Sequence, residues 1–453
     1  MATPREQSAL APHGASPPPR RWGSLDRLME TGLGKLLRTV GFAPKQETGE
    51  SLMQLADALL SVRGRASGPS LASAFFRLYE SCAQEERQAF LTAVHDRHPL
   101  DTAAVAAAIA AWQAEPGDSA GLALHAASES PCRQLINQLN LAPDGTGRLI
   151  AMREDLLRVA RDQRTSGLRA LDREFESAFT AWFNAGFLEL RRISWDSPAV
   201  LLERIIRYEA VHAIRGWEDL RRRVEPVDRR CYGFFHPQMP NDPLIFVEVA
   251  LTRELPGAIH DVIAEERQSI AVRDAQCAIF YSISNCQPGL KGIPFGNHLI
   301  KRVVGLLGEE LAHLKTFATL SPVPGFASWL ASPAGGSPDA IPQGEALRRC
   351  AARYLVTAKG RGNQPSDPVA RFHLGNGARL EAIHANADLS ANGQKQSHGI
   401  MVNYLYDLDY IEANCFGLAE LGTVATSKAV RALVEEQGEE PRRKKGERKS
   451  VPA

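Results

Sequence analysis

A glycine-rich loop between an expected strand and an expected helix is the first segment of this sequence whose residues could do chemistry. Residues 278–283 have the β-branched and aromatic composition of a buried strand, and the loop PGLKGIPFG follows at 288–296. After Asn297, apolar residues recur every three or four positions, which predicts a helix capped by Asn297. Glycines let backbone N–H groups approach a phosphate, and a helix N-terminus favours negative charge. The pattern predicts an anion site over residues 291–297, although plain turn glycines give the same pattern.

A serine and a histidine further along the chain carry the other side chains suited to catalysis. Ser321 ends an expected strand over 315–321 and precedes a proline, and His373 lies between two apolar residues. A hydroxyl paired with an imidazole can accept and deliver a proton near neutral pH. Each residue also has a structural interpretation, as a strand-ending turn or a histidine satisfied in the core. By themselves the residues favour the structural interpretation for both.

Other polar residues have weaker claims to function. His236 lies among prolines, which favours a structural role, with a supporting role at the site as the alternative. Lys301 and Arg302 on the expected helix could meet phosphates or be solvated charges. His95 and His98 fall short of the ligand set that zinc requires, so no metal site is predicted.

The composition limits the class of protein that positions these groups. The 453 residues include 53 Lys+Arg and 52 Asp+Glu, which gives a formal net charge of +1, and 44% are hydrophobic. A nearly neutral chain is not a bulk binder of nucleic acid. A chain of this length and hydrophobicity can bury the cores of two domains, which excludes disordered and disulfide-stapled classes.

The cysteines and the N-terminal composition bear on the compartment. Seven widely spaced cysteines, none in a CxxC pair, favour reduced thiols and a cytoplasmic location. No apolar run reaches the roughly 20 residues of a membrane-spanning helix, so no membrane association is expected. The first two dozen residues are rich in arginine and poor in acids, which leaves the mitochondrial matrix open as the alternative.

The chain divides by composition into four regions. Residues 1–23 and 436–453 are polar or charged and are expected to be disordered tails. Residues 24–186 show the apolar spacing of an all-helical bundle, and residues 187–435 mix strand-like runs with helices. The expected fold class is therefore α+β, with a helical domain followed by a mixed α/β domain.

Two local expectations refine this division. Residues 64–69 contain glycine and proline and predict a break between helices. Residues 197–215 carry apolar side chains at helical spacing and predict one long amphipathic helix.

Six blocks of sequence, dense between about 187 and 424, resemble the malonyl-CoA decarboxylase family. They are FFHPQMPNDPLIFVEVALT (234–252), FYSIS (280–284), IKRVV (300–304), LSPVPGF (320–326), RFHLGNG (371–377) and MVNYLY (401–406). The glycine loop is itself similar to the pyrophosphate loop of the N-acetyltransferase-like (GNAT) superfamily, where acyl-CoA lies between two diverging strands. Long blocks in the right order make the resemblance specific.

The resemblance implies an enzyme that converts malonyl-CoA to acetyl-CoA and CO2 without a metal or an organic cofactor. It implies a helical oligomerisation domain, with assembly as a homodimer or homotetramer, followed by a GNAT-like catalytic domain. Carried over by motif, Ser321 is the proton acceptor and His373 the proton donor, and both contact the substrate. The CoA-binding residues implied in the same way are Lys291, Gly292, Ile293, Pro294, Phe295, Gly296 and Asn297.

The chemistry explains these residue types. Loss of CO2 leaves an enolate whose oxygen needs hydrogen-bond donors and whose carbon needs a proton. For proton donation at cytosolic pH, His373 is expected to keep a nearly neutral pKa. Asn376, Asn403 and Tyr404 are candidate supporting donors, with packing roles as the alternative.

The sequence departs from the family pattern in two places, and two other functions stay open. Pro288 and Lys291 stand where relatives often carry glutamine, and His384-Ala385 stands where an Asn-Trp pair is common. The first departure could alter the CoA loop, and the second leaves the role of that region in the substrate pocket open. The alternatives are another acyl-CoA enzyme of the GNAT superfamily, such as an acyltransferase, and a non-enzymatic scaffold.

Overall fold

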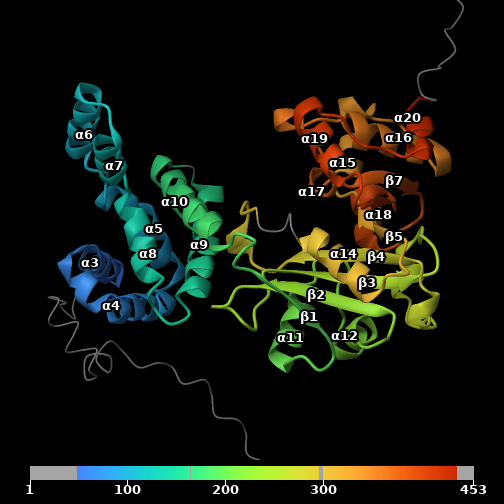
Figure 1. Cartoon of the computed structure of the whole chain (residues 1–453), viewed down its shortest axis with the longest axis horizontal. Helices are drawn as coiled ribbons and strands as arrows, with labels where there is room; N and C mark the ends of the chain where they lie inside the picture. Colours follow the sequence, from blue (N-terminus) through green and yellow to red (C-terminus); the bar gives the residue numbers. More distant parts are fainter. Residues whose placement is uncertain (1–47, 164, 295–298, 436–453) are drawn as a thin grey trace, which may run out of the picture. The chain divides into compact units, whose positions relative to one another are not determined.

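The computed structural model describes residues 48–163, 165–294 and 299–435 (Figure 1). No helix within these ranges is long and apolar enough to cross a bilayer. All seven cysteines are free, and five of them are buried.

The chain divides into two compact units. Unit 1 comprises the described residues up to Gly145 together with Val159–Leu171, and unit 2 comprises Thr146–Arg158 and the described residues from Asp172 onward. Two helices contribute to both units: α9 (Gly145–Asp162) and α10 (Ser166–Trp182).

Unit 1 is helical, and a cluster of aromatic rings forms part of its core. Its other helices are α3 (Thr48–Leu60), α4 (Val62–Ser81), α5 (Gln84–Arg97), α6 (Thr102–Ala114), α7 (Asp118–Ala127) and α8 (Pro131–Leu139). Phe75 of α4 packs edge-on against Phe76 and Phe90, with ring centroids 5.8 and 5.3 Å apart. Burying a ring of this size stabilises the fold by about 1.5–3 kcal/mol.

The break expected at residues 64–69 is present as a kink at Ser67, where two helical segments of α4 meet. Ser67 leaves helical geometry, with φ −132° and ψ 21°, and Pro69 follows it. Proline is tolerated in the first turn of a helical segment, where its missing N–H would have had no partner. The helix therefore continues beyond the kink.

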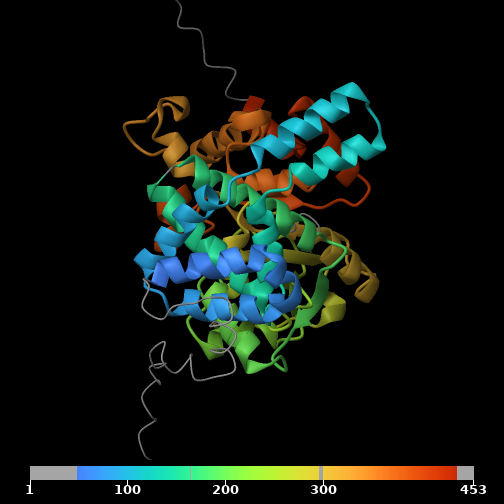
Figure 2. The same cartoon turned by 90° about the vertical axis from the view of Figure 1, so that its left-hand side faces the viewer.

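Helices α6 and α7 form a hairpin at one end of unit 1, away from α3 and α4 (Figures 1 and 2). Helix α7 buries none of its side chains, and α6 buries only Ala108. Ile109, Trp112 and Leu122 are 40, 44 and 70% exposed. The hairpin thus presents apolar surface that the described chain does not cover.

Unit 2 is built on one sheet of eight strands. Their spatial order is β1-β2-β3-β4-β5-β8-β6, and β7 also pairs with β8. The strands are β1 (Glu189–Ile193), β2 (Arg229–Phe235), β3 (Ile245–Thr252), β4 (Cys277–Asn285), β5 (Thr316–Thr319), β6 (Ser321–Pro322), β7 (Arg379–His384) and β8 (Met401–Leu405). Strands β4 and β5 run parallel, and the other pairs are antiparallel. A parallel pair needs a crossover connection, here formed by η2 (Pro288–Leu290) and α14 (Leu299–Glu310).

Helices cover the sheet, with α11 and α12 on one face of the first strands and α14 on the other (Figure 1). The remaining helices of unit 2 are α11 (Ala199–Tyr208), α12 (Trp217–Val224), α13 (Ile259–Ile263), η1 (Val272–Asp274), α15 (Phe326–Leu330), η4 (Pro333–Gly335), α16 (Gly344–Thr357), η5 (Arg361–Asn363), α17 (Pro368–Gly375), α18 (Ala391–Ser397), α19 (Ile411–Leu421) and α20 (Lys428–Glu435). Ile205 and Leu220 share one buried cluster with Phe246, and Ile259 shares another with Ile279.

This architecture confirms the expected fold class of a helical region followed by a mixed α/β domain. The strand, glycine loop, helix and second strand expected over 278–321 are β4, η2, α14 and β5. The parallel β4–β5 pair with its crossover is the arrangement expected of a GNAT-like domain.

The single helix expected over 197–215 is wrong beyond Tyr208, where α11 ends. The carboxylate of Glu209 accepts hydrogen bonds from the backbone N–H groups of Val211 and His212 at 2.9 and 2.8 Å. These bonds satisfy N–H groups that a longer helix would pair with backbone carbonyls. Apolar spacing alone does not reveal this competition.

Arg153 of α9 holds the loop that follows β4. Its buried guanidinium donates to the carbonyl oxygens of Gly289 and Lys291 at 2.9 and 3.0 Å. The same side chain pairs with Asp172 and Glu176 of α10 at 2.8 and 3.2 Å. A buried arginine is stabilised when its charge is paired and its N–H groups are bonded. Arg153, which precedes Gly289 by 136 positions, therefore anchors the loop through the backbone carbonyl oxygens of the loop.

Replacing Gly289 with Ala is expected to destabilise unit 2 by about 1–3 kcal/mol, because the added methyl group overpacks the contact with α9. The new Cβ would lie 2.1 Å from the carbonyl oxygen of Ile150. Gly305→Ala on α14 is the matched control, since its Cβ would meet nothing within 4 Å. Scanning calorimetry measures both; equal unfolding temperatures for the two variants would contradict the prediction.

Candidate active site

A cavity of about 380 Å³ opens where β4 and β5 part. Parallel pairing ends at Phe280 and Thr319, after which Ser321 pairs with Val402 of β8. Strand β4 continues without β5 beside it, so the two strands form opposite walls. The lining residues are Val211, Ile245, Phe280, Tyr281, Ser282, Ile283, Asn285, Ser321, Pro322, Pro368, Val369, Phe372 and His373.

Ser321 and His373 meet in this cavity, although 52 positions separate them in the chain. Ser321 Oγ is 3.2 Å from His373 Nε2, and the serine hydroxyl donates to Thr319 Oγ1 at 2.8 Å. With its proton directed to Thr319, the serine oxygen can accept from Nε2–H. Tyr406 lies on the other side, where its hydroxyl donates to His373 Nδ1 at 2.8 Å. This set of bonds assigns the proton of the neutral imidazole to Nε2.

Burial determines the protonation state of His373. The residue is 2% exposed, and its ring stacks on Tyr404 with a centroid distance of 4.7 Å and an interplanar angle of 23°. Loss of solvation disfavours the imidazolium, which lowers the pKa of His373 to about 3. The expectation of a nearly neutral pKa is therefore wrong for the protein by itself, and the imidazole is neutral at pH 7.

Asp367 fixes helix α17, and so His373, relative to Ser321. Its buried carboxylate caps the first turn of α17 through two backbone N–H groups at 2.9 and 3.0 Å. It also accepts from the backbone N–H of Gly325, just beyond Ser321, at 3.1 Å. A side chain at Gly325 does not fit, because its Cβ would lie 2.2 Å from the hydroxyl oxygen of Tyr354. Steric exclusion of a side chain by Tyr354 thus explains why the LSPVPGF block has glycine at position 325.

The three candidate supporting donors are distributed around this pair. Asn403 donates from its side-chain amide to the carbonyl oxygen of Thr319 at 2.8 Å. Tyr404 contributes its ring face to His373. Asn376 donates to the carbonyl oxygen of Phe372 at 2.8 Å, which closes the end of α17.

A buried carboxylate lies behind one wall of the cavity. The hydroxyl of Ser282 donates to both oxygens of Glu209 at 2.8 and 2.7 Å, and that of Ser284 donates at 3.1 Å. Burial, together with the charge of Glu209, raises the pKa of the neighbouring Glu248 to about 8. Arg223, 3.2 Å from Glu248, is the nearby cation.

The walls of the cavity itself are mainly apolar. Among the lining residues that the structure describes, none is lysine or arginine. A charged substrate group held here would face hydroxyls, an amide, an imidazole and hydrocarbon. Such surroundings solvate an anion poorly.

Only part of the expected CoA-binding segment is described. Lys291, Gly292 and Pro294 are exposed, whereas Ile293 is buried. Gly292 has φ +87°, the left-handed region that favours glycine. None of these four residues lines the cavity that holds Ser321. Phe295, Gly296 and Asn297 lie outside the described residues.

The remaining candidates lie apart from the serine and histidine pair. His236 Nδ1 accepts from the backbone N–H of Gln238 at 3.2 Å. Arg302 donates to the carbonyl oxygen of Leu188 at 3.3 Å, so it is not simply solvated. His98 in unit 1 pairs with Asp57 at 3.3 Å. Within the described ranges, no three His, Cys, Asp or Glu side chains are placed to hold a metal ion.

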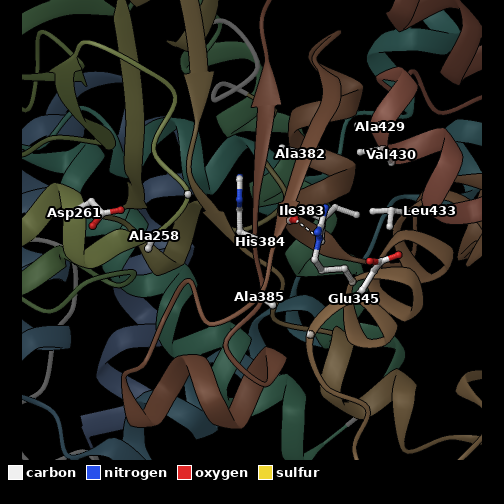
Figure 3. A pocket seen from close by; sticks show the side chains of 13 residues that line it. Ala258, Asp261, Glu345, Ala382, Ile383, His384, Ala385, Ala429, Val430 and Leu433 are labelled. Atoms are coloured by element: carbon white, nitrogen blue, oxygen red, sulfur yellow. Dashed lines mark hydrogen bonds between the residues drawn. The ribbon is translucent and has the colours of Figure 1, made fainter.

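A second cavity, of about 580 Å³, is lined in part by His384 and Ala385, where the sequence departs from the family pattern. Figure 3 shows the His384 ring between Ala258 on one side and Ile383 and Leu433 on the other. Neither His384 nor Ala385 lines the cavity of Ser321. The two cavities therefore have different walls.

The described chain thus combines a helical region with a mixed sheet, and a serine and an imidazole are buried together where the parallel strands part. Family models make the assignment specific. That of the malonyl-CoA decarboxylase N-terminal domain matches residues 99–183, and that of the C-terminal domain matches 186–340 and 337–444. The chain belongs to the malonyl-CoA decarboxylase family.

Individual relatives agree with this assignment. Mitochondrial malonyl-CoA decarboxylase of Anser anser anser is 35% identical over 339 residues, which cover 64% of this chain and 66% of that protein. The protein of the same name from Rattus norvegicus is 34% identical over 356 residues, 67% of this chain and 70% of its own length.

Solved structures of bacterial relatives are also similar. Malonyl-CoA decarboxylase from Rhodopseudomonas palustris has 46% identity and a TM-score of 0.79, covering 85% of this chain and 100% of that chain. The corresponding structure from Agrobacterium vitis has 47% identity and a TM-score of 0.80, covering 84% and 99%.

Sequence reasoning missed four residues that shape the site. Thr319 and Tyr406 lie two positions from Ser321 and Tyr404, so the period of two in a strand could have found them. Asp367 before a proline is a recognisable helix start. Nothing local to Arg153 signals that it anchors a loop 136 residues away.

Replacing Tyr406 with Phe is expected to let His373 populate both neutral tautomers, because buried Nδ1 loses the hydroxyl that donates to it. The loss of this bond should weaken the preference for Nε2–H by about 1 kcal/mol. Nitrogen NMR of the imidazole measures the tautomer, with the exposed Tyr410→Phe as the matched control. An unchanged His373 signal in Tyr406→Phe would show that the hydroxyl does not set the tautomer.

Proposed function

We propose that this chain catalyses the decarboxylation of malonyl-CoA to acetyl-CoA and CO2 in the cavity shared by Ser321 and His373. Membership of the malonyl-CoA decarboxylase family supports the reaction. The observation that carries the assignment of the site is the 3.2 Å contact between Ser321 Oγ and His373 Nε2. The contact lies in a cavity whose described walls contain no lysine or arginine.

The apolar walls favour loss of CO2. The substrate carboxylate holds its charge on two oxygens, whereas the enolate formed after bond cleavage spreads charge over carbon and the thioester oxygen. A site without a cation stabilises the compact carboxylate poorly, so cleavage of the bond to CO2 relieves an unfavourable state. Ser321 contacts the carboxylate before it leaves.

The enolate carbon must then receive a proton. Substrate brings negative charge close to His373, which raises the pKa of the imidazole from its low value and allows a proton to bind. His373 then donates from Nε2 to Ser321 Oγ while the serine hydroxyl gives its own proton to the carbon. One proton is consumed for each CO2 released. Ser321 regains its hydroxyl hydrogen from Nε2, the neutral imidazole is left with its proton on Nδ1, and proton exchange with water restores the Nε2–H form before the next turnover. Serine is the proton acceptor and histidine the donor.

The remainder of CoA is assigned to the segment from Lys291 to Asn297. This segment follows directly after Asn285, a lining residue of the cavity, through the short element η2. Arg153 supports the assignment because it holds the carbonyl oxygens of Gly289 and Lys291. Bonded carbonyls leave the loop backbone fixed rather than free to collapse.

Ser321→Ala and His373→Asn are each expected to lower kcat by about 10²- to 10⁴-fold, the usual worth of positioned acid–base groups. Purified protein is incubated with malonyl-CoA, and acetyl-CoA and released CO2 are measured together. CoA binding, measured by calorimetry, should be largely retained because neither residue belongs to the loop.

The half-buried Ser73 and the exposed His260, neither of which lines the cavity, provide matched controls as Ser73→Ala and His260→Asn. Unchanged turnover in Ser321→Ala and His373→Asn would remove these residues from the reaction. A folded wild-type protein that binds CoA but releases no CO2 would overturn the function itself.

Self-association through residues 24–186, as a homodimer or homotetramer, is proposed on the apolar surface of the α6–α7 hairpin. Trp112→Glu is expected to shift the protein to smaller species in sedimentation, because a charge in an apolar contact is costly. Val62→Glu is the control on another exposed apolar residue of unit 1. A monomeric wild type would contradict the proposal.

A cytoplasmic location, with the mitochondrial matrix as the alternative, is proposed on the seven free cysteines. Fractionation of cells that produce the chain tests the choice. Recovery of the protein with mitochondria would favour the alternative.

A further inference from the structure

His384 touches the active site only through other residues. Its Nε2 lies 2.5 Å from Oδ1 of Asn403. His384 itself lines the second cavity. The amide nitrogen of Asn403 donates to two carbonyl oxygens, those of Thr319 at 2.8 Å and Pro256 at 3.3 Å. A continuous set of hydrogen bonds therefore leads from the second cavity to Thr319 of β5, two positions before Ser321.

The partners of Asn403 determine which group donates in each bond. Carbonyl oxygens only accept, so the side-chain nitrogen must face Thr319 and Pro256, and Oδ1 must face His384. Nε2 of His384 therefore carries a proton. Burial and the nearby Arg348 lower the pKa of His384, which favours the neutral ring with its proton on Nε2.

Thr319 is the point at which this set of bonds meets the reacting pair. Its carbonyl oxygen is held by Asn403, and its Oγ1 accepts from both the hydroxyl of Ser321 and the backbone N–H of Tyr404. Thr319 is also the last residue of β5, where the chain turns away from β4. A shift of Thr319 would move Ser321, whose other support from the sheet is its pairing with Val402 of β8.

We propose that His384 is a positioning residue for the proposed decarboxylation, orienting Asn403 so that Thr319, and through it Ser321, stays aligned with His373. The inference rests on the proposed function for its kinetic consequence. The geometric part does not depend on the reaction: the Nε2 proton of His384 orients Asn403, and Asn403 holds the carbonyl oxygen of Thr319.

The second cavity makes this role accessible to a small molecule. The His384 ring is one of the side chains that line the second cavity, whose volume is about 580 Å³ (Figure 3). Shortening this side chain therefore leaves space that is continuous with the cavity. Gly257 packs against the ring, since a Cβ there would lie 3.1 Å from His384 Nδ1. A ring of the same size could enter this space and donate to Asn403.

Two variants separate the hydrogen bond from the volume of the side chain. His384→Phe keeps a planar ring but has no donor, whereas His384→Gln places an amide N–H near the position of Nε2. His384→Phe is expected to lower kcat by about 10- to 100-fold with KM changed less than about threefold, because the reacting groups are misplaced and CoA contacts are not. His384→Gln should restore most of the lost kcat. A wild-type kcat in His384→Phe would overturn the proposal.

Chemical rescue gives a second test. His384→Ala should lose activity and regain part of it in millimolar imidazole, whereas the wild type and the exposed His260→Ala should not respond. If folded His384→Ala is inactive and imidazole of this concentration restores nothing, the donor role is wrong.

A readout without turnover keeps the inference distinct from the proposed function. Exchange of the Tyr404 amide hydrogen, which bonds to Thr319 Oγ1, should be faster in His384→Phe and unchanged in His384→Gln. Unchanged exchange in His384→Phe would overturn the positioning role even if the wild type proved inactive on malonyl-CoA. A wild type without activity, but with the expected exchange, would overturn only the proposed function.

Discussion

Parallel strands share hydrogen bonds only while they stay adjacent, and in unit 2 β4 and β5 cease to be adjacent after Phe280 and Thr319. The backbone groups beyond this point need other partners, and β6 finds them on β8. The separation creates the cavity and also places Ser321 against β8, which carries Tyr404 and is followed directly by Tyr406. The ring face and the hydroxyl that surround His373 thus come from β8 and the residue after it.

The site is arranged with little net charge, and burial is the reason. His373 is neutral at pH 7, and burial raises the pKa of Glu248 to about 8. The carboxylate of Glu209 is satisfied by two serine hydroxyls and two backbone N–H groups. Under the proposed function, an incoming substrate supplies the main new charge in the cavity. Its carboxylate can change the protonation of His373 because few other charges compete with it.

Much of the fold was predictable, because helical spacing and strand composition are local properties. The two halves, the β4–α14–β5 segment, and Ser321 and His373 as candidates all follow from the sequence and its family resemblance. The interruption of α4 at Ser67 followed from its glycine and proline, whereas the early end of α11 did not follow, since it depends on local hydrogen bonds to Glu209. The low pKa of His373 depends on burial by residues distant in sequence, which no local pattern reports. The same holds for Arg153, whose partners lie on α10, on η2 and on the residue after η2.

The cation-free cavity has a consequence for selectivity among acids. A pocket without lysine or arginine binds a carboxylate weakly, so free dicarboxylic acids of the cell are expected to have low affinity for it. Under the proposed function, recognition then depends on the CoA portion and chemistry on the acyl portion. Binding energy from the distant nucleotide offsets the cost of placing an anion among apolar side chains. The enzyme can thereby ignore abundant small anions and still act on one that arrives attached to CoA.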